Sequence, residues 1–173
     1  NLTVRGGTND QNLVLWDGIK MYQTGHFFGL ISAFNPYLTD KIQFTKNGTS
    51  TSLNDGVSST IDIRSDDKVV KKLSGGAGIN MINGDFFVKI PLSPKMSMQV
   101  SGRRSIADLF ETPTYNQYFE RAFSNTDVAG ISSANDTLLT TNENFYFYDL
   151  NLKLMVDLSE NDKLRVNFLG FNN

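Results

Sequence analysis

The chain has 173 residues, a formal net charge of −2 and no cysteine, and it is long enough to bury a sizeable core. No block of like charges exceeds a pair, which argues against nucleic-acid binding, and the missing cysteines exclude disulfides and thiolate chemistry. Aromatic residues make up 12% of the chain, yet the mean hydropathy is −0.27. This mixture is typical of β-strands with one apolar face and one polar face.

The first segment begins with Val4-Arg5-Gly6-Gly7 and continues into the apolar run 13–16, which ends at Asp17-Gly18. The run is short and apolar on both faces, so we expect a buried strand. Asp-Gly is a turn signal, and a second short strand is expected over residues 19–22. Within this segment Trp16 is expected in the core and Asp17 in the turn.

Asn35-Pro36 predicts a helix of about one turn over residues 36–39, because Asn suits the N-cap and Pro the first helical position. Clean alternation then predicts strands over residues 41–46 and 58–65. Further strands are expected over 73–81, 85–92, 96–101, 146–158 and 164–168. The connections at 93–95 and 159–162 are short, whereas the one at 111–144 is long and is predicted to contain a short amphipathic helix over 115–123.

The segment 146–158 shows the clearest alternation in the chain. One face is apolar (Tyr146, Tyr148, Leu150, Leu152, Leu154, Val156 and Leu158). A strand of this length can cross a bilayer when tilted. The chain has no apolar run long enough for a membrane-spanning helix. It also starts inside a strand-like pattern without a signal peptide, so we expect that its native N-terminus is missing.

Several landmarks occur in one order: VRGG, LWDGI, HFFG, FNP, KIQFTKNG and GVSSTIDIRS. Together they resemble the second half of the plug domain of TonB-dependent outer-membrane receptors, most closely the non-SusC type common in Bacteroidetes. The following segment, GINMINGDFFVKIPLSPKMSMQVSGRRSIADLF, resembles the first barrel strands of the same receptors. One departure is Leu53-Asn54-Asp55-Gly56, where the family often has Tyr-Gly-Gly-Arg.

The resemblance implies a mainly β fold in two parts. Residues 1–67 would be the C-terminal half of an α+β plug. Residues 68–173 would supply about five antiparallel strands of an outer-membrane β-barrel, with the long extracellular loop at 111–144. A full barrel of this family has about 22 strands, so the chain is expected to be a fragment whose sheet edges pair with further strands.

The function implied by the resemblance is energised uptake of a scarce nutrient across the outer membrane of a Gram-negative bacterium. A siderophore, cobalamin, a glycan and a peptide all stay open as ligands. The implied partners are the TonB–ExbB–ExbD complex, acting through plug segments that this chain lacks, and outer-membrane lipid. Neither catalysis nor a cofactor is expected.

The apical plug loop implied by the resemblance contains the candidate substrate-facing residues Tyr22, Gln23, Thr24 and His26. Packing of His26 at the base of this loop is the alternative, and the more frequent role for a lone histidine. A His-based metal site is not expected, because the chain has no second His, no Cys and no HExxH motif.

Arg5 matches the plug arginine that pairs with carboxylates on the barrel wall, and a solvated surface arginine is the alternative. The family's second plug arginine is absent at the Leu53–Gly56 departure, so Arg5 or other groups must hold the plug. Arg103 and Arg104 must point to opposite faces of a regular strand. The lumen-facing one could bind an anion or the plug, although a purely structural role is favoured.

Two other functional classes stay open at this stage. A secreted or surface β-rich binding module is the alternative, but such a module would cover the apolar face of residues 150–158 with a second sheet. An outer-membrane lipase or protease barrel is a third possibility. The sequence lacks a recognisable nucleophile–His constellation for it.

Overall fold

A computed structural model describes residues 4, 6–26, 29, 31–46, 50–53, 56–106 and 146–172. Within these residues the fold is mainly β, and helix is limited to short 3-10 turns such as η1 (Asn9–Gln11). The mainly β class predicted from the sequence is therefore confirmed. No helix in the described ranges is both long and apolar enough to cross a membrane. The long connection at 111–144 and its predicted helix lie outside the described residues.

The N-terminal sheet has the strand order β2-β1-β6-β5. Strands β1 and β6 are parallel, and the other two pairs are antiparallel. A separate antiparallel pair, β3 and β4, follows the first hairpin. The bounds are β1 (Asn12–Trp16), β2 (Ile19–Lys20), β3 (Gly25–His26), β4 (Ile31–Ser32), β5 (Thr39–Lys46) and β6 (Ser59–Ser65).

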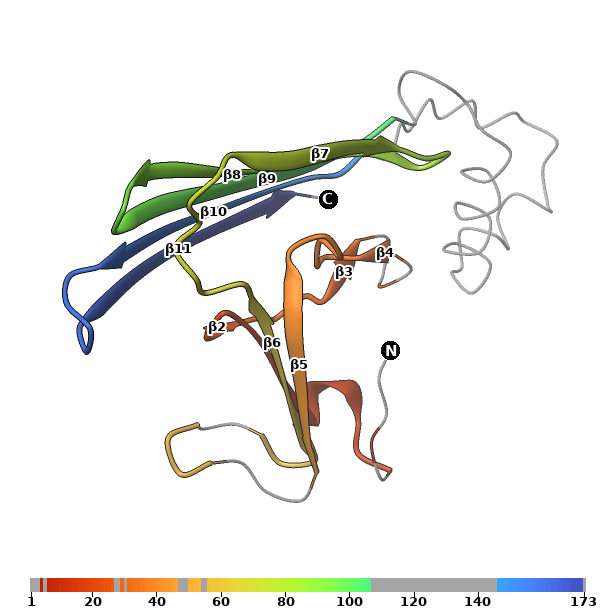
Figure 1. The fold of residues 1–173 in the computed structure, drawn as a ribbon. Coiled ribbons are helices and arrows are strands. Elements are labelled where there is room, and N and C mark those ends of the chain that lie inside the picture. Colours follow the sequence, from red (N-terminus) through yellow and green to blue (C-terminus); the bar gives the residue numbers. More distant parts are fainter. Residues whose placement is uncertain are drawn as a thin grey trace, which may run out of the picture.

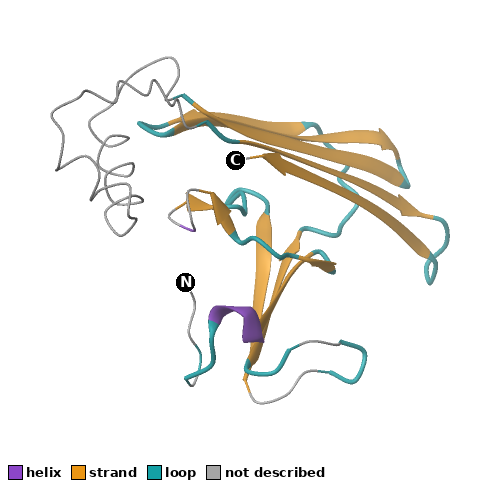
Figure 2. Ribbon diagram, turned by 180° about the vertical axis from the view of Figure 1, so that it is seen from behind, coloured by secondary structure: helices purple, strands orange, loops and turns teal. Residues whose placement is uncertain are grey.

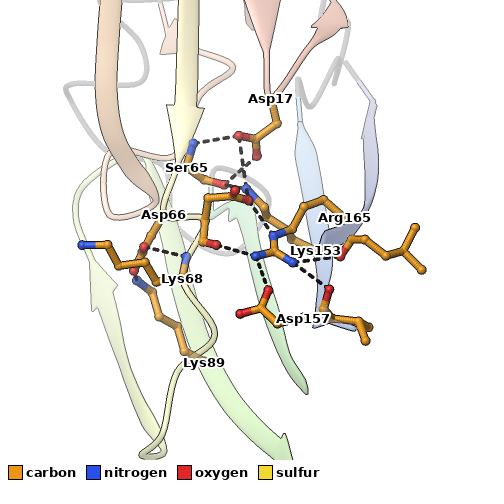
Figure 3. A network of polar contacts seen from close by, with 11 residues as sticks. Asp17, Ser65, Asp66, Lys68, Lys89, Lys153, Asp157 and Arg165 are labelled. Atoms are coloured by element: carbon orange, nitrogen blue, oxygen red, sulfur yellow. Dashed lines mark hydrogen bonds and ion pairs between the residues drawn. The ribbon is translucent and has the colours of Figure 1, made fainter. Parts of the chain in front are cut away.

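The turn between β1 and β2 has the conformation that its sequence predicts. Asp17 and Gly18 both have positive φ, at 47° and 84°. Two consecutive residues with positive φ form a tight turn whose twist matches that of the two strands of a β-hairpin. Aspartate tolerates the left-handed region better than most residues do, and in this turn its carboxylate points toward the end of β6 (Figure 3).

The short helix predicted over residues 36–39 is wrong. The Asn35 side chain does accept a hydrogen bond from the backbone N–H of Tyr37 at 3.0 Å, as a cap would. The backbone N–H of Leu38 then bonds to the Asn35 carbonyl oxygen at 3.2 Å. Thr39 already belongs to β5, so the segment is a single turn. Asn-Pro signals a turn as readily as a helix start, and the β-pairing of Thr39 decides between them here.

The C-terminal sheet is antiparallel throughout and has the order β11-β10-β9-β8-β7. Its bounds are β7 (Ser74–Ile79), β8 (Asn83–Ser93), β9 (Met96–Ser105), β10 (Tyr148–Asp157) and β11 (Lys163–Asn172). These strands confirm the strand predictions made for this part of the chain. Each consecutive pair is hydrogen-bonded, and β7 and β11 are the two edges of the sheet within the described residues.

The C-terminal sheet curves over the end of the N-terminal sheet at which β6 ends and β5 begins (Figure 1). The view from behind shows the same arrangement and the near absence of helix in the drawn elements (Figure 2). The buried apolar cluster lies between the two sheets. It contains Trp16, Met21, Leu38 and Ile63 from the first part of the chain, and Phe87, Leu169 and Phe171 of the C-terminal sheet pack against it.

Trp16 is the centre of this core, as expected, with 2% of its surface exposed. Its ring stacks on that of Phe34 with 5.4 Å between centroids. Tyr37 stacks in the same way on Phe87 of β8, at 5.6 Å. Of these two stacks only Tyr37–Phe87 crosses between the sheets, and Tyr37 is itself exposed. Truncating a buried aromatic side chain of the size of Trp16 typically costs about 3–5 kcal/mol, so Trp16 contributes substantially to the stability of the core.

Candidate functional site

Two groups of residues, held mainly by polar contacts, connect the N-terminal part of the chain to the inner face of the C-terminal sheet. The first, here called the Lys153 network, consists of Asp17, Ser65, Asp66, Asp67, Lys89, Lys153, Asp157 and Arg165. The second, here called the Asp149 cluster, consists of His26, Ser32, Arg103, Phe147 and Asp149.

Lys153 lies in the middle of β10 and points toward the β1–β2 turn (Figure 3). Its ammonium donates to Ser65 Oγ at 3.0 Å and lies 3.4 Å from Asp17 Oδ1. The Asp17 carboxylate also accepts hydrogen bonds from the backbone N–H and the hydroxyl of Ser65. Because the side chains of Lys153 and Asp17 are only 3% and 5% exposed, each compensates the other's buried charge.

Asp67 extends this contact to the edge strand β11. Its Oδ1 lies 3.3 Å from the Lys153 ammonium and 2.9 Å from Arg165 Nε. Arg165 also donates to the backbone carbonyl oxygen of Asp67 and to the Asp157 carboxylate, at 2.9 and 2.7 Å. One guanidinium therefore ties the segment after β6 to both β10 and β11.

Asp66 forms a third ion pair at the same level of the sheet. Its Oδ2 lies 3.1 Å from the ammonium of Lys89, on β8. Burial opposes ionisation of this carboxyl group, but hydrogen bonding from the Lys68 backbone N–H and the charge of Lys89 outweigh burial. The pKa of Asp66 is therefore lower than its ordinary value, and the carboxylate stays ionised at neutral pH.

A cavity of about 310 Å³ borders the Lys153 network, and its walls are mainly charged. It is lined by Asp17, Gly18, Arg64, Ser65, Asp67, Lys153, Arg165 and Asn167. Lys153 and Ser65 lie at the distance expected between a general base and the hydroxyl group that it deprotonates. An ammonium that already lies against two carboxylates has no lone pair with which to take the hydroxyl proton. The geometry therefore favours a charged contact between sheets over nucleophilic chemistry.

In the Asp149 cluster Arg103 binds both a strand and the β3–β4 pair. Its Nε and Nη2 both lie 2.7 Å from Asp149 Oδ2, and Nη2 also donates to the Ser32 carbonyl oxygen at 2.7 Å. Arg103 is buried, whereas its neighbour Arg104 is exposed on the other face. The two arginines thus point to opposite faces, as expected, and the inward one holds the N-terminal part of the chain.

His26 is completely buried in this cluster. Its ring stacks on Phe147 with 4.2 Å between centroids, and Nε2 lies 3.4 Å from Asp149 Oδ2. This is the packing alternative for His26 rather than a substrate-facing position. Tyr22, in contrast, is 88% exposed, and Gln23 donates from Nε2 to the carbonyl oxygen of Gly25 within the loop.

The structure thus separates the predicted substrate-facing residues. Three of the four residues precede β3 and are accessible to solvent. Tyr22 and Gln23 are exposed, and Thr24 is partly exposed. His26 lies within β3, beneath the C-terminal sheet. The ligand-binding role of the loop stays a prediction. Arg5, the predicted partner for wall carboxylates, lies outside the described residues.

The pairing implied for Arg5 places the cation in the N-terminal part and the carboxylates on the barrel wall. The ion pairs described here have the reverse arrangement. The cations Lys89, Lys153 and Arg165 come from the C-terminal sheet, and the carboxylates Asp17, Asp66 and Asp67 come from the N-terminal part. From the sequence, Asp17 was expected only to form the turn. Lys153 lies in the otherwise uncharged middle of β10, on the polar face of the strand. This lysine was the one signal in the sequence that could have predicted a buried ion-pair partner.

Among the described residues no group of three or more His, Cys, Asp or Glu side chains could hold a metal ion. In comparisons with known proteins, no family model matches the chain and no curated protein matches it.

Proposed function

We propose that the chain is part of a TonB-dependent outer-membrane receptor that takes up a scarce nutrient by energised transport. In this proposal the N-terminal sheet belongs to the plug, and the C-terminal sheet is the first section of the barrel wall. The observation that carries the proposal is the exposure pattern of the C-terminal sheet, whose polar face is covered and whose apolar face is exposed.

Strand β10 illustrates the pattern. Asp149, Asn151 and Lys153 are 6%, 7% and 2% exposed, whereas Tyr148 and Leu150, on the opposite face, are 47% and 41% exposed. A sheet that packs in water has the reverse arrangement, with its apolar side chains inside.

The pattern continues across the neighbouring strands in register. Leu152 pairs with Val100 and Phe168, and Leu154 pairs with Met98 and Val166. The result is a continuous apolar outer face made of alternate residues of β8, β9, β10 and β11. Apolar patches larger than a few hundred Å² rarely face water in monomeric proteins. An outward apolar band around a polar interior is the arrangement expected of a wall surrounded by lipid.

The contact between the sheets supports the plug assignment. It combines a small apolar core with ion pairs contributed by Asp17, Asp66 and Asp67. If the plug moved, these groups and their cationic partners would enter the polar interior of the barrel, where water can solvate them. Ion pairs can thus fix the resting position without making movement prohibitively costly.

The resemblance of the sequence supplies the mechanism of the proposal. Nutrient binds on the outer side of the plug, near the loop that contains Tyr22, Gln23 and Thr24. The TonB–ExbB–ExbD complex in the inner membrane then pulls on the plug and opens a path. The residues of this chain hold the plug and contact the nutrient, and none is assigned a catalytic role.

Extraction from membranes tests the location. Washing cells' envelope fractions with high salt and then with alkaline carbonate should leave the full-length protein in the pellet, and detergent should release it. Release by carbonate alone would overturn the receptor proposal and favour the secreted or surface binding module. A growth defect of the deletion strain limited to one scarce nutrient would then identify the ligand class.

A further inference from the structure

Arg103 lies between two carboxylates on the inner face of the C-terminal sheet. Asp85 of β8 is its partner in register on one side, and Asp149 of β10 is its partner on the other. Residues directly opposite on neighbouring strands have Cβ atoms about 4.5–5.5 Å apart, so the long Arg103 side chain can reach either carboxylate. In the structure it binds Asp149, with Nε and Nη2 both 2.7 Å from Oδ2.

Asp85 takes no part in this ion pair. Its Oδ1 is buried and has no hydrogen-bond partner among the described residues, and its Oδ2 accepts one long hydrogen bond, of 3.4 Å, from the Asn83 side chain. The carboxylate lies over Gly78 of β7, because a Cβ atom added to that glycine would be 3.2 Å from Oδ1. A buried acceptor without a donor costs free energy, so Asp85 has hydrogen-bonding capacity that the resting structure leaves unused.

The N-terminal part of the chain holds Arg103 on the side of Asp149. The Ser32 carbonyl oxygen, in β4, accepts a hydrogen bond of 2.7 Å from Nη2, the same nitrogen that contacts Asp149. His26, in β3, lies with Nε2 3.4 Å from the carboxylate oxygen that binds the guanidinium. If the β3–β4 pair leaves the sheet, the contacts of Ser32 and His26 are lost, whereas both carboxylates stay beside Arg103.

We propose that Arg103 is a side chain with two positions. With the β3–β4 pair in place it binds Asp149 and Ser32, and with the pair displaced it turns toward Asp85 and binds both carboxylates. A guanidinium has five N–H donors in a planar fork, which is enough for two acceptors at once. The bond to Asp85 replaces the lost bond to Ser32 and so lowers the free energy of the displaced state.

The inference rests on the proposed function, in which the N-terminal sheet belongs to a plug that moves. It goes beyond that function by naming Asp85 as a residue of the C-terminal sheet that stabilises the displaced state. The direction of its effect distinguishes this role from a structural one. Loss of a residue that holds the resting fold together speeds opening of the β3–β4 pair, whereas loss of the Asp85 charge should slow it.

Hydrogen exchange of the full-length protein in detergent tests the direction. The Ala33 amide reports opening, because its N–H donates to the Thr24 carbonyl oxygen at 3.0 Å. Asp85→Asn removes the charge and keeps the shape of the side chain. We expect exchange of this amide to become about tenfold slower. Glu160→Gln, which removes an exposed charge from the β10–β11 turn, should leave the rate unchanged.

A second comparison shows whether the effect acts through Arg103. In an Arg103→Met background, adding Asp85→Asn should change the exchange rate of Ala33 by no more than about twofold, because the side chain that Asp85 would bind is gone. If Asp85→Asn does not fold, Asp85→Ser, which is also neutral, takes its place. The far-UV circular dichroism of each variant is the folding check.

Three results would overturn the two-position role of Arg103: faster exchange in Asp85→Asn, an unchanged rate, or equal slowing in the presence and absence of Arg103. They would leave the receptor proposal intact, because carbonate extraction of the native membrane tests that proposal separately. Release by carbonate would remove the receptor proposal, and with it the plug movement that the two positions serve.

Discussion

Arg103, on β9, donates to the backbone carbonyl oxygen of Ser32, in β4, at 2.7 Å. The same guanidinium binds Asp149 on β10. The β3–β4 pair has only a two-residue register of its own, and a two-stranded hairpin this short is not stable in isolation. Its position beneath the C-terminal sheet therefore depends on Arg103 and on the packing of His26 against Phe147.

Replacing Arg103 with Met should loosen the β3–β4 pair, and it should also destabilise the protein as a whole because Asp149 stays buried without its guanidinium partner. The substitution removes charge-assisted hydrogen bonds, and we expect the free energy of local opening to fall by about 2 kcal/mol, which is about thirtyfold faster amide exchange. Hydrogen exchange of the amides of His26 and Ala33 measures this, because the Ala33 N–H is bonded to the Thr24 carbonyl oxygen across the pair. Arg104→Met is the matched control, because Arg104 points to the other face, and equal acceleration in both variants would contradict the assignment.

Replacing Lys153 with Met should destabilise the protein strongly. It leaves the buried carboxylate of Asp17 without its ammonium partner, and breaking a buried pair from one side typically costs about 3–5 kcal/mol. Urea unfolding of the protein in lipid vesicles gives the difference in free energy. Lys163→Met removes an exposed charge from β11, and we expect a change of less than about 0.5 kcal/mol.

The double variant Asp17→Asn, Lys153→Met distinguishes a lost pair from general damage to β10. With both charges removed, much of the cost of Lys153→Met should be recovered, because no uncompensated charge stays buried. If the effects of the two single substitutions simply add, Asp17 and Lys153 are not coupled, and the role assigned to the Lys153 network is wrong.

The elements of the fold could be predicted from the sequence where local chemistry decides them. Asp17-Gly18 specified its hairpin turn through two positive φ values. The alternation in β10 specified which face of the C-terminal sheet is buried. The helix predicted after Asn35 failed because pairing of Thr39 in β5 is a tertiary effect that a cap motif does not report.

The ion pairs between the sheets could not be predicted in the same way. Asp17 and Lys153 lie 136 positions apart, and nothing local indicates that a turn aspartate meets the middle of β10. For His26, packing was the role favoured from the sequence, but its partners could not be predicted. Phe147, just before β10, and Phe171, in β11, lie against its ring in the fold.

The Asp66–Lys89 pair should make stability depend on pH in the acidic range. The pKa of Asp66 is lowered in the folded protein, whereas in the unfolded chain it is about 3.9. The stabilisation is therefore present above the unfolded value and is lost as the pH falls through the folded value. Urea unfolding should show a difference between the wild type and Asp66→Asn that is constant above about pH 5 and shrinks below about pH 4.

Lys89→Gln provides the control for the source of this effect. Without the ammonium, the Lys68 backbone N–H still donates to Asp66, so the pH-dependent difference should become smaller without disappearing. A pH dependence that Lys89→Gln leaves unchanged would show that the ion pair across to β8 does not lower the pKa of Asp66.

An arginine placed on the outer face of the C-terminal sheet should report whether that face lies in lipid. Leu152 is near the middle of β10, and Leu158 follows the end of the strand. If the face is in lipid, Leu152→Arg should cost about 2–4 kcal/mol in vesicles, whereas Leu158→Arg, near an interface, should cost about 0–1 kcal/mol. Unfolding by guanidinium chloride in vesicles measures both.

If the face contacts water instead, an added surface charge changes stability by no more than about 0.5 kcal/mol at either position. Near-equal, small effects of the two substitutions would therefore remove the barrel-wall assignment, even if the sheet itself folds as described.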